Sequence, residues 1–177
     1  MKKKTLALVL ALTLLVAGVV GGTLAWLTDQ TAEVKNTFTV GDINIGLTET
    51  TTDYKMVPGN TIAKDPTVTV KANSEACWLF VKVTKSENLD TFITYAIAEG
   101  WTALPGVDGV YYREVPASAA DQTFSVLADN AVTVKDTVTK EMLTAKDFAN
   151  PTLTFKAYAV QKDNVASASD AWAKVNP

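Results

Sequence analysis

The feature that most constrains the fold is a succession of short segments in which apolar and β-branched residues alternate with polar ones. Side chains branched at Cβ pack well on a pleated surface, and a period of two is the signature of a half-buried strand. The segments that carry this pattern are 36–47, 67–71, 76–84, 92–98, 109–115, 123–127, 131–135 and 152–160. About eight short strands separated by turn signals predict an all-β fold, a two-sheet sandwich of the jelly-roll type.

Local signals refine this prediction. Between Val40 and Ile43 the apolar parity changes at a Gly-Asp step, which indicates a β-bulge or a sharp bend. The sequence Met-Val-Pro-Gly-Asn at 56–60 predicts a turn. Segments 139–148 and 167–175 each begin with a capping residue and predict two short helices.

The first 25 residues predict a cleavable signal helix. Three lysines, Lys2 to Lys4, precede a run of sixteen uncharged residues that is rich in Leu, Val and Ala. Thr23 and Ala25 then supply the small residues of a signal-peptidase site, with Trp26 as the new N-terminus. The alternative is an uncleaved membrane anchor, but sixteen residues give a helix of about 24 Å against a hydrocarbon core of about 30 Å. We therefore predict a signal peptide at 1–25 and a single β-sandwich domain at 26–177, secreted to the cell surface or the extracellular matrix.

The charge and the single cysteine exclude several classes of function. Without the signal segment the chain has 13 basic side chains against 19 acidic ones, a net charge near −6 that disfavours nucleic acid as a partner. Cys77 is the only cysteine, so an intramolecular disulfide is impossible. Because Cys77 lies in an apolar run, we predict a small buried hydrophobe rather than a reactive thiol.

The absence of histidine constrains the chemistry most strongly. Zinc hydrolases and Ser-His-Asp or Cys-His nucleophiles all need imidazole, and the chain has none. We therefore predict no catalytic residues, no metal site and no cofactor. Residues that could suggest a calcium site are more simply turn residues: Asp121, Asp129, Asn130, Asp163 and Asn164.

Aromatic residues leave one binding hypothesis open. Trp78, in a strand, and Trp172, on a helix, are predicted core residues, whereas Trp101 follows Gly100 and remains a candidate sugar-stacking ring. Together with the pair Tyr111-Tyr112, it supports an alternative function, a monomeric cell-surface module that binds a glycan or a host ligand.

Both ends of the chain resemble a known family. The motifs that carry the resemblance are GTLAWLTD at 22–29, NTFTVGDI at 36–43, VPGNTIAKDPTVTV at 57–70, and AYAVQ at 157–161 with the later Ala171-Trp172. They are similar to the camelysin/TasA-like proteins of Gram-positive bacteria, whose signal peptide is removed by a dedicated SipW-type peptidase. The resemblance implies a secreted jelly-roll subunit of surface or biofilm-matrix fibres.

The resemblance also implies how such a subunit assembles. In TasA-like fibres the mature N-terminal segment completes a sheet of the neighbouring copy, and the corresponding residues here are Leu27, Val34, Phe38 and Val40, after Trp26. The expected partners are other copies of the chain or a homologous matrix subunit, and the signal peptidase during export. The name camelysin carries a metallopeptidase label, but a chain without histidine lacks the usual ligands of such a site, so this activity is the least favoured alternative.

Overall fold

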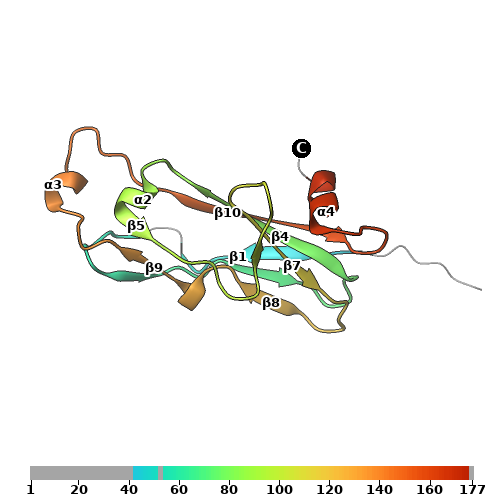
Figure 1. Ribbon diagram of the computed structural model, residues 1–177. Helices are drawn as coiled ribbons and strands as arrows, with labels where there is room; N and C mark the ends of the chain where they lie inside the picture. The colour runs from blue at the N-terminus through green and yellow to red at the C-terminus, as the bar shows by residue number, and fades with distance from the viewer. Residues whose placement is uncertain (1–41, 52–53, 176–177) are drawn as a thin grey trace, which may run out of the picture. The chain divides into compact units, whose positions relative to one another are not determined.

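Antiparallel pairing accounts for every strand ladder in the computed structural model, which describes residues 42–51 and 54–175 (Figure 1). The strands are β1 (Ile45–Thr48), β2 (Thr61–Ala63), β3 (Thr67–Val70), β4 (Cys77–Lys85), β5 (Ile93–Thr94), β6 (Thr102–Ala103), β7 (Val110–Val115), β8 (Gln122–Ser125), β9 (Ala131–Val134) and β10 (Leu153–Gln161). The helices are α2 (Leu89–Phe92), α3 (Lys140–Leu143) and α4 (Ala168–Val175), with a 3₁₀ turn at Ala128–Asn130. The predicted β-rich fold with few short helices is confirmed. Among the described residues, no helix has the length and apolar character needed to cross a membrane.

The strands form three sheets, in the orders β1-β3-β8, β10-β4-β7-β6 and β2-β9-β5. The first and third sheets are two halves of one bent sheet, because backbone hydrogen bonds continue between them. Val126 N–H donates to the carbonyl of Pro66 at 2.9 Å, and Lys64 N–H donates to the carbonyl of Asn130 at 2.7 Å. The bend lies where Pro66 lacks an N–H and where Asp129 and Asn130 take positive φ angles of 55° and 50°.

The main core lies between the β1-β3-β8 sheet and the β10-β4-β7-β6 sheet. Val68 and Val70 of β3 belong to the same buried cluster as Leu79 and Val81 of β4. Cys77, fully buried, is part of this cluster and confirms the prediction of a small hydrophobe. Two sheets therefore pack face to face through alternate residues of each strand.

The other face of the β10-β4-β7-β6 sheet is covered by helix α4 (Figure 1). Trp172 of the helix packs its ring against Phe80 at 5.3 Å and against Tyr158 at 5.2 Å between ring centroids. Trp78 lies in the same cluster, and its indole N–H donates to the carbonyl of Val165 at 3.2 Å. Both tryptophans are core residues, as predicted from the sequence.

The secondary structure differs from the sequence prediction around residue 92. Residues 92–98 were predicted as one strand, but Phe92 ends helix α2, and only Ile93 and Thr94 form strand β5. Leu89 and Phe92 are both buried and lie three residues apart, so one helical turn puts them on the same side. The later residues still follow the bent sheet, since Ile97 bridges Leu127.

The second difference concerns the helix predicted at 139–148. The helix begins at Lys140 after Thr139, whose Oγ1 accepts from the N–H of Met142 at 3.4 Å, but it ends at Leu143. Phe148, predicted as part of the helix, lies beyond its end and packs its ring against Phe92 at 5.5 Å between centroids. The helix at 167–175 is confirmed as α4, and the turn at 56–60 is confirmed by Gly59, whose φ is 77°. Strands β2 and β6 were not predicted.

Gly109 allows β7 to begin directly beside β4. It has a φ of 70°, its carbonyl accepts from the N–H of Val83 at 2.7 Å, and a Cβ placed on it would lie 2.5 Å from the carbonyl oxygen of Val83. Gly106, in the same connection, has a φ of 75° but nothing within 4 Å of its Cβ position. The two glycines share a backbone conformation and differ in the space around them.

We expect Trp172→Ala to lower the free energy of unfolding by about 3–5 kcal/mol, because it removes the largest side chain that α4 packs against the sheet. Urea unfolding followed by far-UV circular dichroism measures this change. Lys174→Ala, at an exposed position of the same helix, serves as the control and should stay within about 0.5 kcal/mol of the parent. Equal losses in the two variants would mean that α4 does not stabilise the sheet through Trp172.

A second pair of variants separates backbone strain from steric clash. Gly106→Ala should cost about 1–2 kcal/mol, the penalty of placing a Cβ in the left-handed region. Gly109→Ala carries the same penalty and adds the clash with Val83, so its loss of stability should be clearly larger. Urea midpoints of the two variants provide the comparison, and a Gly109→Ala protein no less stable than Gly106→Ala would contradict it.

Candidate functional site

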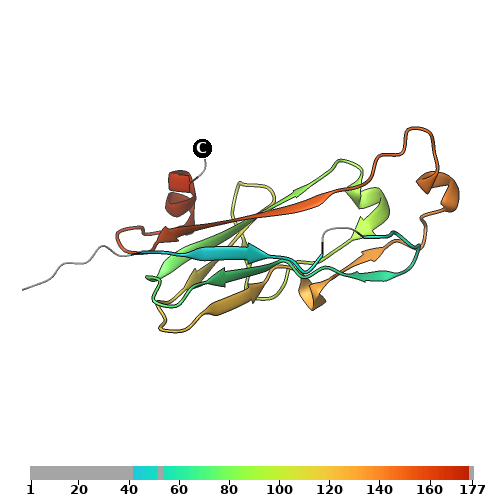
Figure 2. The same cartoon turned by 180° about the vertical axis from the view of Figure 1, so that it is seen from behind.

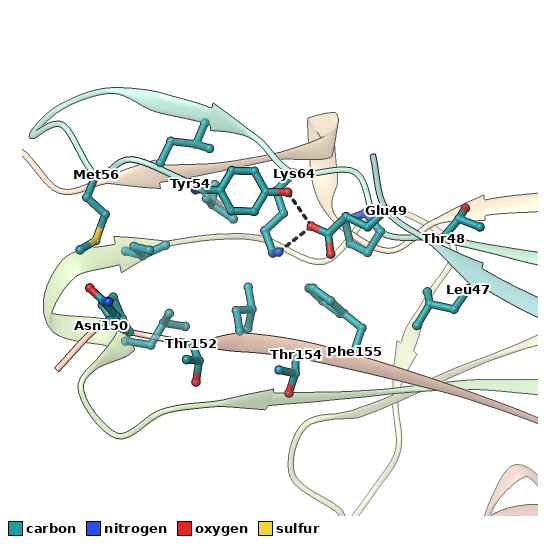
Figure 3. A pocket seen from close by; sticks show the side chains of 17 residues that line it. Leu47, Thr48, Glu49, Tyr54, Met56, Lys64, Asn150, Thr152, Thr154 and Phe155 are labelled. Carbon is teal, nitrogen blue, oxygen red and sulfur yellow. Dashed lines mark hydrogen bonds and ion pairs between the residues drawn. The ribbon is translucent and has the colours of Figure 1, made fainter. Parts of the chain in front are cut away.

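A cleft of about 720 Å³ lies beside two edge strands, β1 of the bent sheet and β10 of the other sheet (Figure 3). Among the described residues β1 pairs only with β3, and β10 pairs only with β4. The lining is largely apolar. It consists of Leu47, Thr48, Glu49, Tyr54, Met56, Ile62, Lys64, Pro66, Leu89, Ile93, Val132, Asn150, Pro151, Thr152, Leu153, Thr154 and Phe155.

A lysine and a carboxylate meet inside this cleft. Lys64 Nζ lies 2.6 Å from Glu49 Oε1, and the two side chains are only 9% and 16% exposed. The hydroxyl of Tyr54 donates to the same carboxylate oxygen at 2.7 Å (Figure 3). Desolvation by burial, and then the hydrogen bond to Glu49, raise the pKa of Tyr54 far above its usual value, so this hydroxyl stays protonated.

Aromatic rings surround the amine of Lys64. Its Nζ lies 4.8 Å from the ring centroid of Tyr54 and 5.5 Å from that of Phe155. Ring faces attract a cation, and this attraction increases where water is excluded. The amine therefore has one charged partner and two apolar walls.

A second contact fixes the chain that follows β1. The backbone N–H of Thr50 donates to Asp65 Oδ1 at 2.9 Å, and its hydroxyl donates to Asp65 Oδ2. The hydrogen bonds from the Thr50 hydroxyl and then from its N–H lower the pKa of Asp65. Consecutive residues, Glu49 and Thr50, are thus held by the consecutive residues Lys64 and Asp65 at the bend between β2 and β3.

Glu49, Tyr54 and Lys64 were not predicted from the sequence. One signal could have found Lys64, because every second residue from Ile62 to Val70 turns inward: the set is Ile62, Lys64, Pro66, Val68 and Val70. A lysine in such a row is a buried cation that needs a partner. The partner, fifteen residues earlier, could not be identified from spacing alone.

The candidate sugar-stacking ring lies in the core. Trp101 is only 9% exposed and belongs to the main buried cluster, and its indole N–H donates to the carbonyl of Ser125 at 2.8 Å. Trp101, kept as a candidate because it follows Gly100, is therefore not an exposed sugar-stacking ring, since its indole packs into the main core and bonds to Ser125. Tyr112 packs against Trp78, with 5.9 Å between ring centroids.

Tyr111 takes a different place from its neighbour, at a second and smaller cleft. This cleft, of about 400 Å³, is lined by Lys85, Asp90, Ile93, Thr94, Tyr95, Ile97, Tyr111 and Lys135. Lys85 forms an exposed ion pair with Asp90 there. The two adjacent tyrosines of the sequence thus lie on opposite faces of the sheet and do not form one surface.

The residues considered for calcium are turn residues where the structure defines them. Asp129, Asn130 and Asn164 all have positive φ angles. Asp121 Oδ1 accepts from the N–H of Ala72 at 2.8 Å, and this hydrogen bond, followed by that from Lys71, lowers its pKa. Within 42–51 and 54–175, no group of three or more acidic or cysteine side chains is arranged to hold a metal ion.

Cys77 is confirmed as a buried residue, and desolvation raises the pKa of its thiol to about 11. The predicted cleavage residues Thr23, Ala25 and Trp26 lie outside the described residues, as do Leu27, Val34, Phe38 and Val40 of the predicted donor segment. Comparison of the chain with protein-family models, with curated proteins and with solved structures finds no match. The function is therefore inferred from the residues and their geometry.

We expect Lys64→Met to lower the free energy of unfolding by about 3–5 kcal/mol, because it leaves the Glu49 carboxylate buried without a cation. The control is Lys71→Met, which breaks an ion pair with Asp121 whose side chains are 51% and 47% exposed. Exposed pairs contribute at most about 1 kcal/mol. Urea denaturation of both variants tests the difference, and similar small losses would mean that the Glu49–Lys64 pair does not hold the bend.

Proposed function

We propose that this chain is a secreted, non-enzymatic structural protein, a jelly-roll subunit of extracellular fibres. Two features support the proposal: the signal-like segment at 1–25 and the β-rich domain that follows it. The resemblance to camelysin/TasA-like proteins points in the same direction. On this proposal a SipW-type peptidase removes the leader during export, and the mature chain assembles at the cell surface or in the biofilm matrix.

The observation that carries the proposal is the apolar cleft beside edge strands β1 and β10. An edge strand presents unpaired backbone N–H and C=O groups, which an added strand can satisfy. Pockets for alternate side chains then supply specificity in this mode of recognition. A cleft with Leu47 at one end and Met56 at the other offers both kinds of contact (Figure 3).

The proposed occupant is the N-terminal segment of another copy. In an extended strand, alternate residues lie about 6.6 Å apart and point to the same side, so Phe38 and Val40 can enter one row of pockets. Each large apolar side chain contributes roughly 1.5–3 kcal/mol when fully buried. Ordering the segment costs roughly 1–2 kcal/mol per residue, which over its whole length is at least as much as its apolar side chains gain. Assembly therefore needs backbone pairing as well as side-chain burial.

We expect removal of residues 26–40 from the mature chain to abolish filaments while leaving the folded domain intact. The experiment compares the mature and shortened proteins by negative-stain electron microscopy, with circular dichroism to verify the fold. The shortened protein should still accept a donor strand, so it should cap filaments of the mature protein when the two are mixed. Filaments that form equally well from the shortened protein would refute strand donation.

The acceptor side is tested by a matched pair of surface variants. Leu47 lines the cleft and is 36% exposed, whereas Val57 is 48% exposed and lies outside the lining. Leu47→Asp should reduce filament length and number, because it places a charge in the proposed acceptor cleft. Val57→Asp adds the same charge and should assemble normally. Equal assembly by the two variants would place the acceptor surface elsewhere.

A further inference from the structure

The buried pair of Glu49 and Lys64 brings an amine and a carboxyl group to reacting distance. With Nζ 2.6 Å from Oε1 and a carboxyl C–O bond of about 1.23 Å, Nζ is at most about 3.8 Å from the Glu49 carboxyl carbon. Groups held about 3–3.5 Å apart in the right orientation react as if at very high concentration. A small shift of the lysine tip therefore suffices for attack.

The reaction needs the uncharged forms of both groups, and one proton transfer inside the pair supplies them. Two charges lose much of their hydration when they are taken from water, and moving one proton from Nζ to the carboxylate removes both charges. The amine faces the rings of Tyr54 and Phe155, and the carboxylate accepts a hydrogen bond from the Tyr54 hydroxyl. A neutral amine beside a neutral carboxyl group is the reactive state.

Tyr54 supplies the third group. Its hydroxyl lies 2.7 Å from Glu49 Oε1 and also within hydrogen-bond distance of the carbonyl of Thr51. A donor aimed at a carboxyl oxygen stabilises the negative charge that develops there when the carbon is attacked. Because burial raises the pKa of Tyr54, this donor keeps its proton.

From this geometry we infer that Lys64 and Glu49 form an intramolecular amide, an isopeptide bond, in the folded protein. The nitrogen lone pair of the neutral amine forms a bond to the Glu49 carboxyl carbon, and the bond from that carbon to its hydroxyl oxygen breaks. One proton from the nitrogen leaves with the hydroxyl as water. The step needs no oxidant, no metal and no second substrate, and the product is lighter by one water molecule.

Three other ion pairs among the described residues can be compared with the Glu49–Lys64 pair by their exposure. Lys71–Asp121, Lys85–Asp90 and Lys162–Glu114 have side chains between 42% and 63% exposed. Water reaches both side chains at those sites and competes with the contact between them. The amide is therefore expected at Lys64 and not at the exposed pairs.

The test is mass spectrometry of the purified protein. The intact mass of the folded wild type should be lower than the sequence mass by one water molecule. Trypsin should yield a branched peptide that joins 36–55 to 56–71, because trypsin does not cleave after an amidated Lys64. Lys64→Met and Glu49→Ala should each show the full mass and no branched peptide, whereas Lys71→Met should lose water like the wild type.

Tyr54→Phe keeps the ring and removes the hydroxyl, so the cross-linked fraction at a given time after refolding should be several-fold lower than in the wild type. A cross-linked fraction equal to that of the wild type would remove Tyr54 from the reaction. Unfolding by urea before any amide forms should prevent the loss of water, since the groups meet only in the fold. A folded wild type that keeps its full mass after prolonged incubation, or a branched peptide joined at another lysine, would overturn the inference. The result is independent of filament formation, because it is measured on a single chain.

Discussion

The packing of the domain depends on strand β4, because both faces of this strand are buried. Leu79 and Val81 face the bent sheet, while Trp78 and Phe80 face helix α4, and all four residues are at most 6% exposed. β4 also lies between β10 and β7, so its backbone pairs on both sides. Each core cluster of the β10-β4-β7-β6 sheet rests on it, and the placement of β10 at the sheet edge follows from its pairing with β4.

The gap between the edge strands β1 and β10 is packed at one end and open at the other. Strands β1 and β10 run side by side (Figure 2), and Ile45 and Ala157 contribute to one core cluster. Farther along β10, beside Leu153 and Phe155, the cleft replaces this packing. The Glu49–Lys64 pair lies in that cleft, directly after β1 ends. The same region thus combines free strand edges with the most buried ion pair of the described residues.

Most of the strands could be predicted because their signal is local. Alternation identified β3, β4, β7, β9 and β10 to within a residue or two, since a period of two with β-branched residues leaves few alternatives. Strand β2 and strand β6 are only three and two residues long, too short for a period. The prediction of one strand at 92–98 was wrong because helix α2 ends at Phe92 and β5 follows without a break. The last apolar residue of the helix was therefore counted as the first residue of the strand. In each case the secondary structure was decided by tertiary packing, because the local spacing of apolar residues did not determine it.

The candidate site was harder to predict, because its residues come from separate segments. Trp101 was judged by its neighbour Gly100, but its exposure is decided by Ser125 and Val126, which lie at the end of β8 in the facing sheet. Glu49 and Lys64 meet only because the chain bends at Pro66 and because Asp65 fixes Thr50. The inward row that includes Lys64 would have indicated a buried cation. The identity of its partner depends on the path of residues 49–56, which no period in the sequence encodes.

The proposed amide and the proposed strand donation have a joint mechanical consequence. In a fibre held by N-terminal segments, tension would enter each subunit just before β1, a strand of four residues paired only with β3 among the described residues. Once β1 had separated from β3, the next barrier would be the link between Glu49 and Lys64. An ion pair would yield there, whereas an amide would pass the load directly to the β2–β3 bend. Residues 50–63, including β2, would then be bypassed and could not be extended, and the load would reach β3, whose neighbours rest on the β4 core.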